Sequence, residues 1–149
     1  MRTMALDIGT KRIGVAITDP LGMLAQPLTV IRRSSDAHAV GEILQLLRER
    51  DVDELVIGLP RRTDGTEGPE AQAVREFAAL IGAKWPGTIS WYDERMTTAS
   101  AEQVLLEADL SRMRRKQVVD QVAASLILQG HLEYQKRTPG KTTDNKNEE

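Results

Sequence analysis

Large apolar residues alternate with small or polar ones at the start of the chain, as in strands with one buried face. Every second residue is large and apolar between residues 3 and 8, and again between residues 13 and 18. The link 9–12 is short enough for a hairpin. Residues 24–31 are a third candidate strand, which Pro27 predicts to lie at an edge or to be bulged. The pattern predicts an antiparallel three-stranded meander.

Helical periodicity and short apolar runs follow this meander. Apolar residues at helical spacing predict helices over residues 35–50 and from Pro69 to about Ile81. The continuous apolar run 55–59 is typical of a buried parallel strand, and residues 88–92 are a fifth strand candidate. Strands that alternate with helices indicate an α/β fold with a mixed sheet.

The last third of the chain is predicted to be helical and then disordered. We expect a helix from Thr98 to Ala108, a basic link over 110–116 and a final helix over 117–135. The polar residues 138–149 have nothing to bury and are expected to form a disordered tail. The predicted order is β-β-β-α-β-α-β-α-α, a mixed five-stranded sheet with helices on both faces, in one domain spanning residues 1–137.

Composition limits the class of protein. The 149 residues include no cysteine, which excludes a disulfide framework and thiolate zinc sites. No signal-peptide pattern is present, and no apolar run approaches the roughly 20 residues of a membrane span. We expect a cytoplasmic protein that does not enter a membrane.

Basic residues are clustered although the net charge is only −2. The clusters are Lys11 with Arg12, Arg61 with Arg62, and Arg112, Arg114, Arg115 and Lys116. Basic patches around an acidic site suit an enzyme that acts on a polyanion, although any single pair could equally be a solvated surface feature. Aromatic residues make up only 3% of the chain, which favours recognition of backbone or shape over base stacking.

Acidic residues occur at three informative places. Asp7 ends an apolar strand, where an unpaired charge is costly. Asp93 and Glu94 end the fifth strand, and ligands collect at the carboxyl ends of strands in such sheets. Asp120 shares a helical face with Ala124, whose small side chain would let the helix approach the first strand. Two alternatives stay open: Asp120 could favour the dipole of an exposed helix start, and the acids at 93 and 94 could form an ordinary turn.

These acids indicate a hard metal ion. Three carboxylate positions, no cysteine and only two histidines favour Mg²⁺ or Mn²⁺ over zinc, and converging carboxylates can hold two such ions about 3.5–4 Å apart. His38 and His131 have no partner spacing and are expected to be structural or surface residues. A rival interpretation is a nucleotide-binding hairpin of the actin and sugar-kinase type, but those proteins need a second such domain.

Four stretches in order carry a resemblance to a known family. They are LDIGTKRIGVAITD from Leu6, GLPRRTDGTEGPEA from Gly58, DERMTT from Asp93 and RKQVVDQVAASLILQ from Arg115. With these motifs the chain resembles the YqgF-like (RuvX-like) proteins, a family associated with Holliday junction resolution and pre-16S rRNA processing. The resemblance implies a ribonuclease H-like fold.

The resemblance also implies roles for the acids. Asp7, the acid of the DER stretch and Asp120 match the catalytic metal ligands of a nuclease. Asp93 and Glu94 alternate across the strand, so one of them faces the metal; we favour Glu94. Resolvases of this fold carry an acid on the fourth strand, and the predicted fourth strand, residues 55–59, has none. The metal shell would then be completed from the fifth strand or by water.

Basic positions of the same motifs imply contacts with the substrate. The residues expected to contact phosphate are Lys11, Arg12, Arg95, Arg115 and Lys116. The loop residues 64–66 also match and are expected to shape one wall of the cleft.

The expected function is metal-dependent hydrolysis of phosphodiester bonds in structured nucleic acid, with water as the nucleophile and a 5′-phosphate as product. The first substrate that we expect is the end of pre-16S rRNA, and the second is a four-way DNA junction in recombination and repair. A resolvase works as a two-fold dimer, so a monomer would favour RNA processing. A non-catalytic nucleic-acid-binding factor is the third interpretation, which the presence of all three acid positions disfavours.

Overall fold

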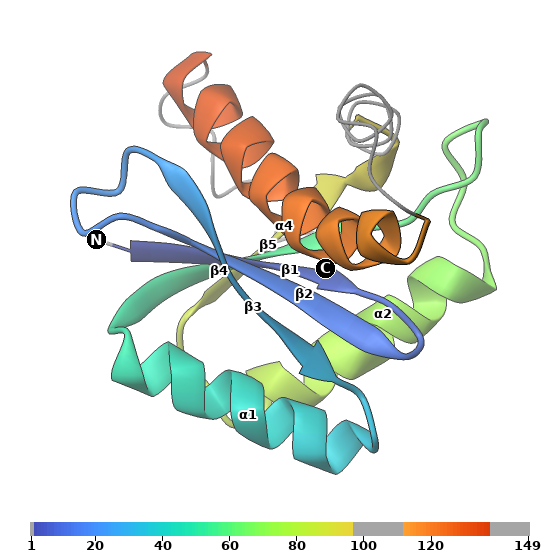
Figure 1. Ribbon diagram of the computed structural model, residues 1–149, viewed down its shortest axis with the longest axis horizontal. Helices are drawn as coiled ribbons and strands as arrows, with labels where there is room; N and C mark the ends of the chain where they lie inside the picture. The colour runs from blue at the N-terminus through green and yellow to red at the C-terminus, as the bar shows by residue number, and fades with distance from the viewer. Residues whose placement is uncertain (1, 97–111, 138–149) are drawn as a thin grey trace.

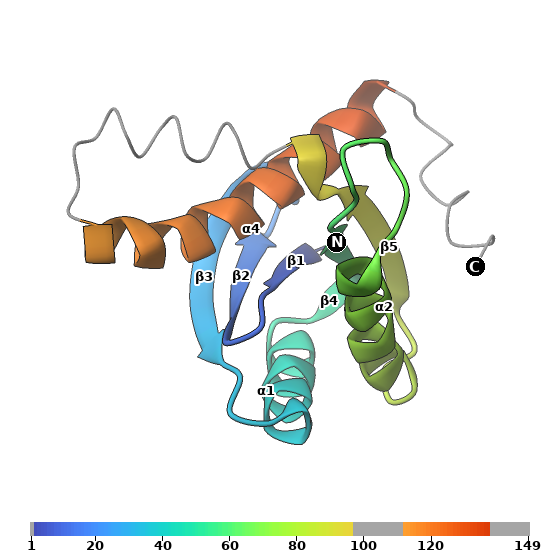
Figure 2. The same ribbon diagram turned by 90° about the vertical axis from the view of Figure 1, so that its right-hand side faces the viewer.

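Five strands form one mixed sheet in the order β3-β2-β1-β4-β5 (Figures 1 and 2). The computed structural model describes residues 2–96 and 112–137, and in the second segment the side chains of residues 122–136. The strands are β1 (Arg2–Ile8), β2 (Arg12–Thr18), β3 (Ala25–Arg32), β4 (Val52–Leu59) and β5 (Thr88–Asp93). The helices are α1 (Asp36–Glu49), α2 (Pro69–Gly82), the 3₁₀ turn η1 (Glu94–Met96) and α4 (Arg112–Arg137).

The meander and the two parallel strands occupy different halves of the sheet. β1, β2 and β3 pair antiparallel in sequence order, and β4 and β5 run parallel to β1 on its other side. The register of β2 and β3 shifts between Val15 and Ala16, opposite Thr29 and Pro27. The prediction of a bulged edge strand at Pro27 is therefore confirmed. The expected mixed sheet with helices on both faces is confirmed as well.

Helices cover the two faces of the sheet unequally. α1 and α2 lie on one face and α4 crosses the other (Figure 2). The first face buries large side chains, including Leu6, Ile57 and Phe77. The α4 face buries a smaller cluster, in which the fully buried Ala5 and Ala16 lie under the helix. Ala124 of α4 is fully buried in the same cluster, so the expectation that its small side chain lets the helix approach the sheet is confirmed, and small residues on the strands contribute as well.

Two predicted boundaries are wrong. β4 begins at Val52 rather than at residue 55, because Asp53 accepts a hydrogen bond from the backbone N–H of Arg2 (3.1 Å) and Glu54 accepts one from the Ser90 hydroxyl (2.7 Å). Polar residues that find partners can continue a strand.

The predicted basic link is the second wrong boundary, because its residues 112–116 are the first residues of α4. Arginine, lysine and methionine are good helix formers, and neither glycine nor proline interrupts the chain there. The predicted helix 98–108 and the tail 138–149 lie outside the described residues. Among the described residues, no helix combines the length and the hydropathy that crossing a membrane requires.

Candidate active site at the carboxyl ends of β1, β4 and β5

The fold brings Asp7 and Glu94 together from two strands that are not neighbours. β4 lies between β1 and β5, and all three strands run in the same direction. Their carboxyl ends therefore share one edge of the sheet. Glu94 directly follows β5, and its carboxyl group is hydrogen-bonded to that of Asp7. Side chains at one edge can meet across the central strand only if that strand leaves room.

Gly58 on β4 provides this room. A Cβ atom placed on Gly58 would lie 2.7 Å from Oε2 and 2.8 Å from Cγ of Glu94, and 2.6 Å from Cδ1 of Ile127. Both distances to Glu94 are shorter than real Cβ atoms tolerate. The Glu94 side chain therefore lies across the backbone of β4, beneath Ile127 of α4, and reaches Asp7 through the space that a side chain would otherwise fill.

The electrostatics of this pair are unusual. The pKa of Glu94 is raised to about 8. Burial of its carboxyl group is the largest cause, followed by the negative charge of Asp7 and the hydrogen bond to Asp7. Two carboxyl groups can be hydrogen-bonded only if one of them carries a proton. A divalent cation would replace this shared proton, so the pair fits the oxygen ligands that Mg²⁺ and Mn²⁺ prefer.

Asp93 points away from this pair. Its carboxylate accepts hydrogen bonds from Arg95 Nη2 (2.6 Å) and Nε (2.9 Å), and it lies 4.0 Å from Arg61 Nε. The hydrogen bonds from Arg95 are the largest cause of a lowered pKa of Asp93. The structure thus separates the two adjacent acids: Glu94 faces Asp7, and Asp93 faces two arginines. This arrangement supports the choice of Glu94 as the metal ligand.

Asp120 falls within α4, and its side chain is not among those that the structure describes. Along the helix it comes four residues before Ala124 and seven before Ile127, both of which are buried against the sheet. Arg115 and Lys116 belong to the same first part of α4, so contacts of these three residues stay predictions. Among the described side chains, no group of three acids or histidines is arranged to hold a metal ion.

The basic residues of the first hairpin, Lys11 and Arg12, follow Asp7 at the turn between β1 and β2. The Gly9 N–H donates to the carbonyl of Arg12 (2.9 Å), and a Cβ on Gly9 would lie 2.8 Å from that oxygen, so the turn requires glycine. Lys11 is exposed in this turn. Arg33 holds the turn from the end of β3 because its Nη1 donates to the carbonyl of Gly9 (2.9 Å). No pattern in the sequence indicates this role of Arg33, since its partner is a backbone atom far away in the chain.

A buried polar cluster lies elsewhere on the α4 face. Glu54 accepts a hydrogen bond from the Ser90 hydroxyl (2.7 Å). Its Oε2 also lies 3.2 Å from His131 Nε2 on α4. This second contact is an ion pair when the imidazole is protonated, and it does not have the geometry of a hydrogen bond. Burial alone would raise the pKa of Glu54, but His131 and Ser90 stabilise its carboxylate more strongly and lower it. The fourth strand therefore does carry an acid, four residues before Gly58 and directed at α4. His131 is buried, as a structural residue would be.

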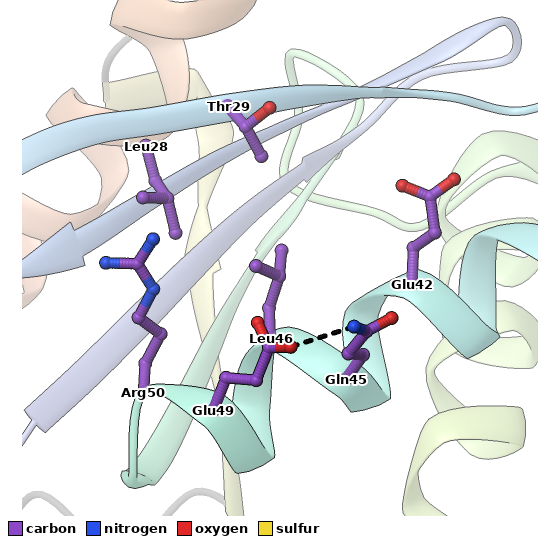
Figure 3. A pocket seen from close by; sticks show the side chains of 7 residues that line it. All are labelled: Leu28, Thr29, Glu42, Gln45, Leu46, Glu49 and Arg50. Atoms are coloured by element: carbon purple, nitrogen blue, oxygen red, sulfur yellow. Dashed lines mark hydrogen bonds between the residues drawn. The ribbon is translucent and has the colours of Figure 1, made fainter.

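A pocket of about 420 Å³ lies on the other side of the sheet, between β3 and α1 (Figure 3). Its lining residues are Leu28, Thr29, Glu42, Gln45, Leu46, Glu49 and Arg50. Gln45 and Glu49 are hydrogen-bonded to each other at 2.8 Å. None of the acids or basic residues predicted for the site contributes to this pocket.

Comparisons with known proteins identify the family. Residues 1–134 match the family model described as "RuvX: Holliday junction resolvase". A protein of Moorella thermoacetica, provisionally named a pre-16S rRNA nuclease, is 55% identical over 133 residues, which are 89% of this chain and 95% of that protein. A Clostridium botulinum protein with the same provisional name is 49% identical over 89% of this chain and 97% of its own length.

Solved structures confirm the fold. Thermus thermophilus RuvC in complex with a Holliday junction substrate superposes with a TM-score of 0.61 at 12% identity, over 93% of this chain and 97% of that chain. The Fowlpox virus resolvase in complex with Holliday junction DNA gives a TM-score of 0.55 at 12% identity, over 90% and 98% of the two chains. These likenesses support a ribonuclease H-like fold. The family match and the closely similar sequences show that the chain belongs to the RuvX (YqgF-like) family.

Proposed function

We propose that this protein is a nuclease that hydrolyses phosphodiester bonds in structured nucleic acid with the help of divalent metal ions, and that its substrate is the end of pre-16S rRNA. The observation that carries the proposal is the contact between the Asp7 and Glu94 carboxyl groups across Gly58. Family membership and the provisional names of relatives at 49–55% identity support the substrate. Both point away from the nucleotide-binding kinase interpretation.

Asp7, Glu94 and Asp120 are the residues that would hold Mg²⁺ or Mn²⁺, and we expect two ions. The chemistry supplied by bound divalent cations is activation of a water molecule and stabilisation of the leaving oxygen. Asp7 is held in place by its register opposite Gly14 on β2, and Glu94 by the space over Gly58. Two acids fixed by a sheet present their oxygens to a cation with little reorganisation.

Basic residues would hold the nucleic acid against these acids. Lys11 and Arg12 follow Asp7 in the first hairpin, and Arg115 and Lys116 precede Asp120 in α4. Contacts from such residues to phosphate would position the backbone without reading its sequence. Binding should weaken as the salt concentration rises, because each phosphate contact releases counterions. A cytoplasmic location follows from an rRNA substrate.

A four-way DNA junction is the second candidate substrate. The observation that favours it is the fold shared with Thermus thermophilus RuvC, which was solved with a Holliday junction. Resolution of a junction requires a two-fold dimer, whereas a monomer would support RNA processing. A non-catalytic binding factor of the same fold would have no need for the Asp7–Glu94 contact.

The test is a paired cleavage assay with a pre-16S rRNA and a four-way DNA junction, each in Mg²⁺, in Mn²⁺ and with a chelator. We expect cleavage of the RNA in either metal and none with the chelator. Asp7→Asn, Glu94→Gln and Asp120→Asn should each lower the rate by about 100-fold or more. Glu49→Gln, an exposed acid of α1, is the matched control and should cleave like the wild type.

The assay tests the role of each acid separately. Unchanged cleavage by a folded variant would remove that acid from the catalytic set. Cleavage of the junction alone, by a dimer, would replace the proposed substrate with the second candidate. Metal binding without cleavage of either substrate would support the non-catalytic factor.

A further inference from the structure

We infer that Asp93 and Arg95 form a clamp that positions Glu94, and that Arg95 acts through this clamp rather than by binding the substrate backbone. The inference rests on the proposed nuclease function and assigns roles to the two residues on either side of Glu94. Both are positioning residues, since the structure directs their side chains to each other.

The clamp closes around a single residue. Arg95 donates to the Asp93 carboxylate through Nη2 (2.6 Å) and Nε (2.9 Å), and the backbone N–H of Arg95 donates to Oδ1 of Asp93 (3.0 Å). A side chain that binds the N–H two residues ahead fixes the intervening backbone in a tight turn. The intervening residue is Glu94. Its direction of departure from β5 is therefore set by the two residues beside it.

A docked loop completes the clamp. Arg95 Nη1 donates to the carbonyl of Thr63 (3.2 Å) in the loop between β4 and α2. Asp64 closes that loop by accepting hydrogen bonds from the N–H (2.9 Å) and the hydroxyl (2.7 Å) of Thr66.

Arg61 makes a second connection between the loop and the clamp. Its Nη1 donates to the carbonyl of Gly65 (3.1 Å), and its Nε lies 4.0 Å from Asp93. The DER stretch and the loop thus fix each other's position.

These contacts leave Arg95 a poor ligand for phosphate. A phosphate group seeks the planar fork of a guanidinium, and the Asp93 carboxylate already occupies this fork with two short hydrogen bonds. A phosphate would also meet the negative charge of Asp93 at close range. The side chains of Lys11 and Arg95 are both exposed, but the Arg95 guanidinium is already paired with Asp93, and this geometry gives Arg95 a different role.

The test is a double-mutant cycle with Asp93→Ala, Arg95→Ala and the double variant. We expect each single variant to lower kcat by about 10-fold, and the double variant to be no slower than the slower single one, because either change opens the same clamp. KM and the slope of log K against log salt should stay those of the wild type. Asp93→Asn keeps the acceptor for the Arg95 N–H and should lose less activity than Asp93→Ala. If the alanine variant does not fold, Asp93→Asn replaces it in the cycle.

A phosphate-binding Arg95 would give the opposite pattern. Arg95→Ala would then weaken binding and reduce the salt slope by about one contact, while Asp93→Ala would free the guanidinium and tighten binding. Either result would overturn the clamp. Arg75 provides the matched control, because this residue of α2 forms an equally short pair with Glu67 (2.7 and 2.8 Å). A tenfold loss of kcat in Arg75→Ala would also overturn the clamp, because loosening the loop at any point would then be enough to lower kcat.

A structural readout separates this inference from the nuclease proposal. In a crystal structure of Asp93→Ala, which removes the acceptor for the Arg95 N–H, we expect the Glu94 carboxyl group to have moved away from Asp7. A Glu94 side chain that stays hydrogen-bonded to Asp7 would refute the clamp, whether or not the wild type cleaves nucleic acid. If the wild type cleaves neither substrate but Glu94 moves in the variant, the nuclease function is refuted and the clamp stands.

Discussion

At the scale of single residues, the Asp7–Glu94 contact places two acidic groups side by side where burial raises the pKa of one of them. Two carboxyl groups in contact repel each other unless a proton or a cation lies between them. Stability alone would favour a neutral or apolar pair. Groups with strongly shifted pKa values concentrate at functional sites, because the chemistry requires what folding would avoid.

The raised pKa of Glu94 predicts how stability depends on pH. Unfolded Glu94 ionises near pH 4.5, whereas folded Glu94 holds its proton until about pH 8 in the absence of metal. The free energy of unfolding of the metal-free protein should therefore decrease between these values, by on the order of 5 kcal/mol, and level off above pH 8. Thermal unfolding with a chelator, measured from pH 5 to pH 9, tests this expectation.

Glu94→Gln isolates the effect, since it removes one titrating group and keeps the shape. Its stability should exceed that of the wild type increasingly as the pH rises from 5 to 8. Other groups that titrate in this range contribute equally to both proteins. Parallel stability curves for the two proteins would show that Glu94 is not responsible.

The sequence predicted part of this residue-scale arrangement. Asp7 was identifiable because a charge inside an apolar strand needs a partner. Alternation along the strand predicted only that one of Asp93 and Glu94 would face the metal site, and it did not decide which. The bidentate partner of Arg95 and the anchor of Arg33 were not predictable. The first depends on the turn that the chain makes after β5, and the second on a backbone atom 24 residues away.

At the scale of elements, the site depends on β4 contributing a glycine. Gly58→Ala should displace the ends of the Glu94 and Ile127 side chains, which lie 2.6–2.8 Å from the new Cβ. We expect a loss of about 1–3 kcal/mol in the free energy of unfolding and a clear loss of cleavage. Denaturant unfolding and the cleavage assay measure the two effects.

Gly41→Ala is the matched control for this substitution. Gly41 lies in α1, and a Cβ there would meet nothing within 4 Å. Alanine favours a helix over glycine, so Gly41→Ala should stabilise the protein by about 0.5–1 kcal/mol and leave cleavage unchanged. Full activity in Gly58→Ala would show that Glu94 reaches Asp7 by another route.

The errors at this scale also have physical reasons. The strands with clean alternation were predicted closely, and the starts of β4 and α4 were not. Glu54 looks like a loop residue in the sequence because its partner Ser90 belongs to another strand. The arginines at the start of α4 look like a link because clustered charge resembles a surface turn, although such side chains favour helices.

At the scale of the whole molecule, α4 is held on a thin apolar layer reinforced by a polar cluster. The cluster joins Glu54 of β4 to His131 of α4 and Ser90 of β5. Glu54→Gln should lower the free energy of unfolding by about 1–3 kcal/mol at pH 7, because a buried partner is left imperfectly paired. Asp53→Asn, its exposed neighbour, is the control and should change stability by less than about 0.5 kcal/mol.

The pH dependence gives this prediction a second check. The pKa of Glu54 is lowered in the folded protein, so its contribution is complete above the unfolded value near 4.5 and is lost as the pH falls through the folded value. The difference between the wild type and Glu54→Gln should therefore shrink in acid. A difference that grows toward low pH would contradict this assignment.

The architecture as a whole followed from the order of elements. A meander followed by strands alternating with helices predicts a mixed sheet covered on both sides, and the structure has one. The placement of β4 beside β1, rather than at the free edge of β3, was not determined by periodicity. That placement decides which strand ends meet, and with it the composition of the site.

Gly58 has a consequence for how related sequences are compared. Resolvases of this fold carry an acid on the fourth strand, and a sequence alignment would find glycine at position 58 of this strand. The carboxylate that fills the space above Gly58 belongs to Glu94 instead. The two positions depend on each other: a bulkier residue at 58 would displace a long acid at 94, and a shorter acid at 94 would leave the space empty. Positions 58 and 94, which are 36 residues apart in the sequence, therefore have to be compared together, and a superposition of structures shows that they form one part of the site.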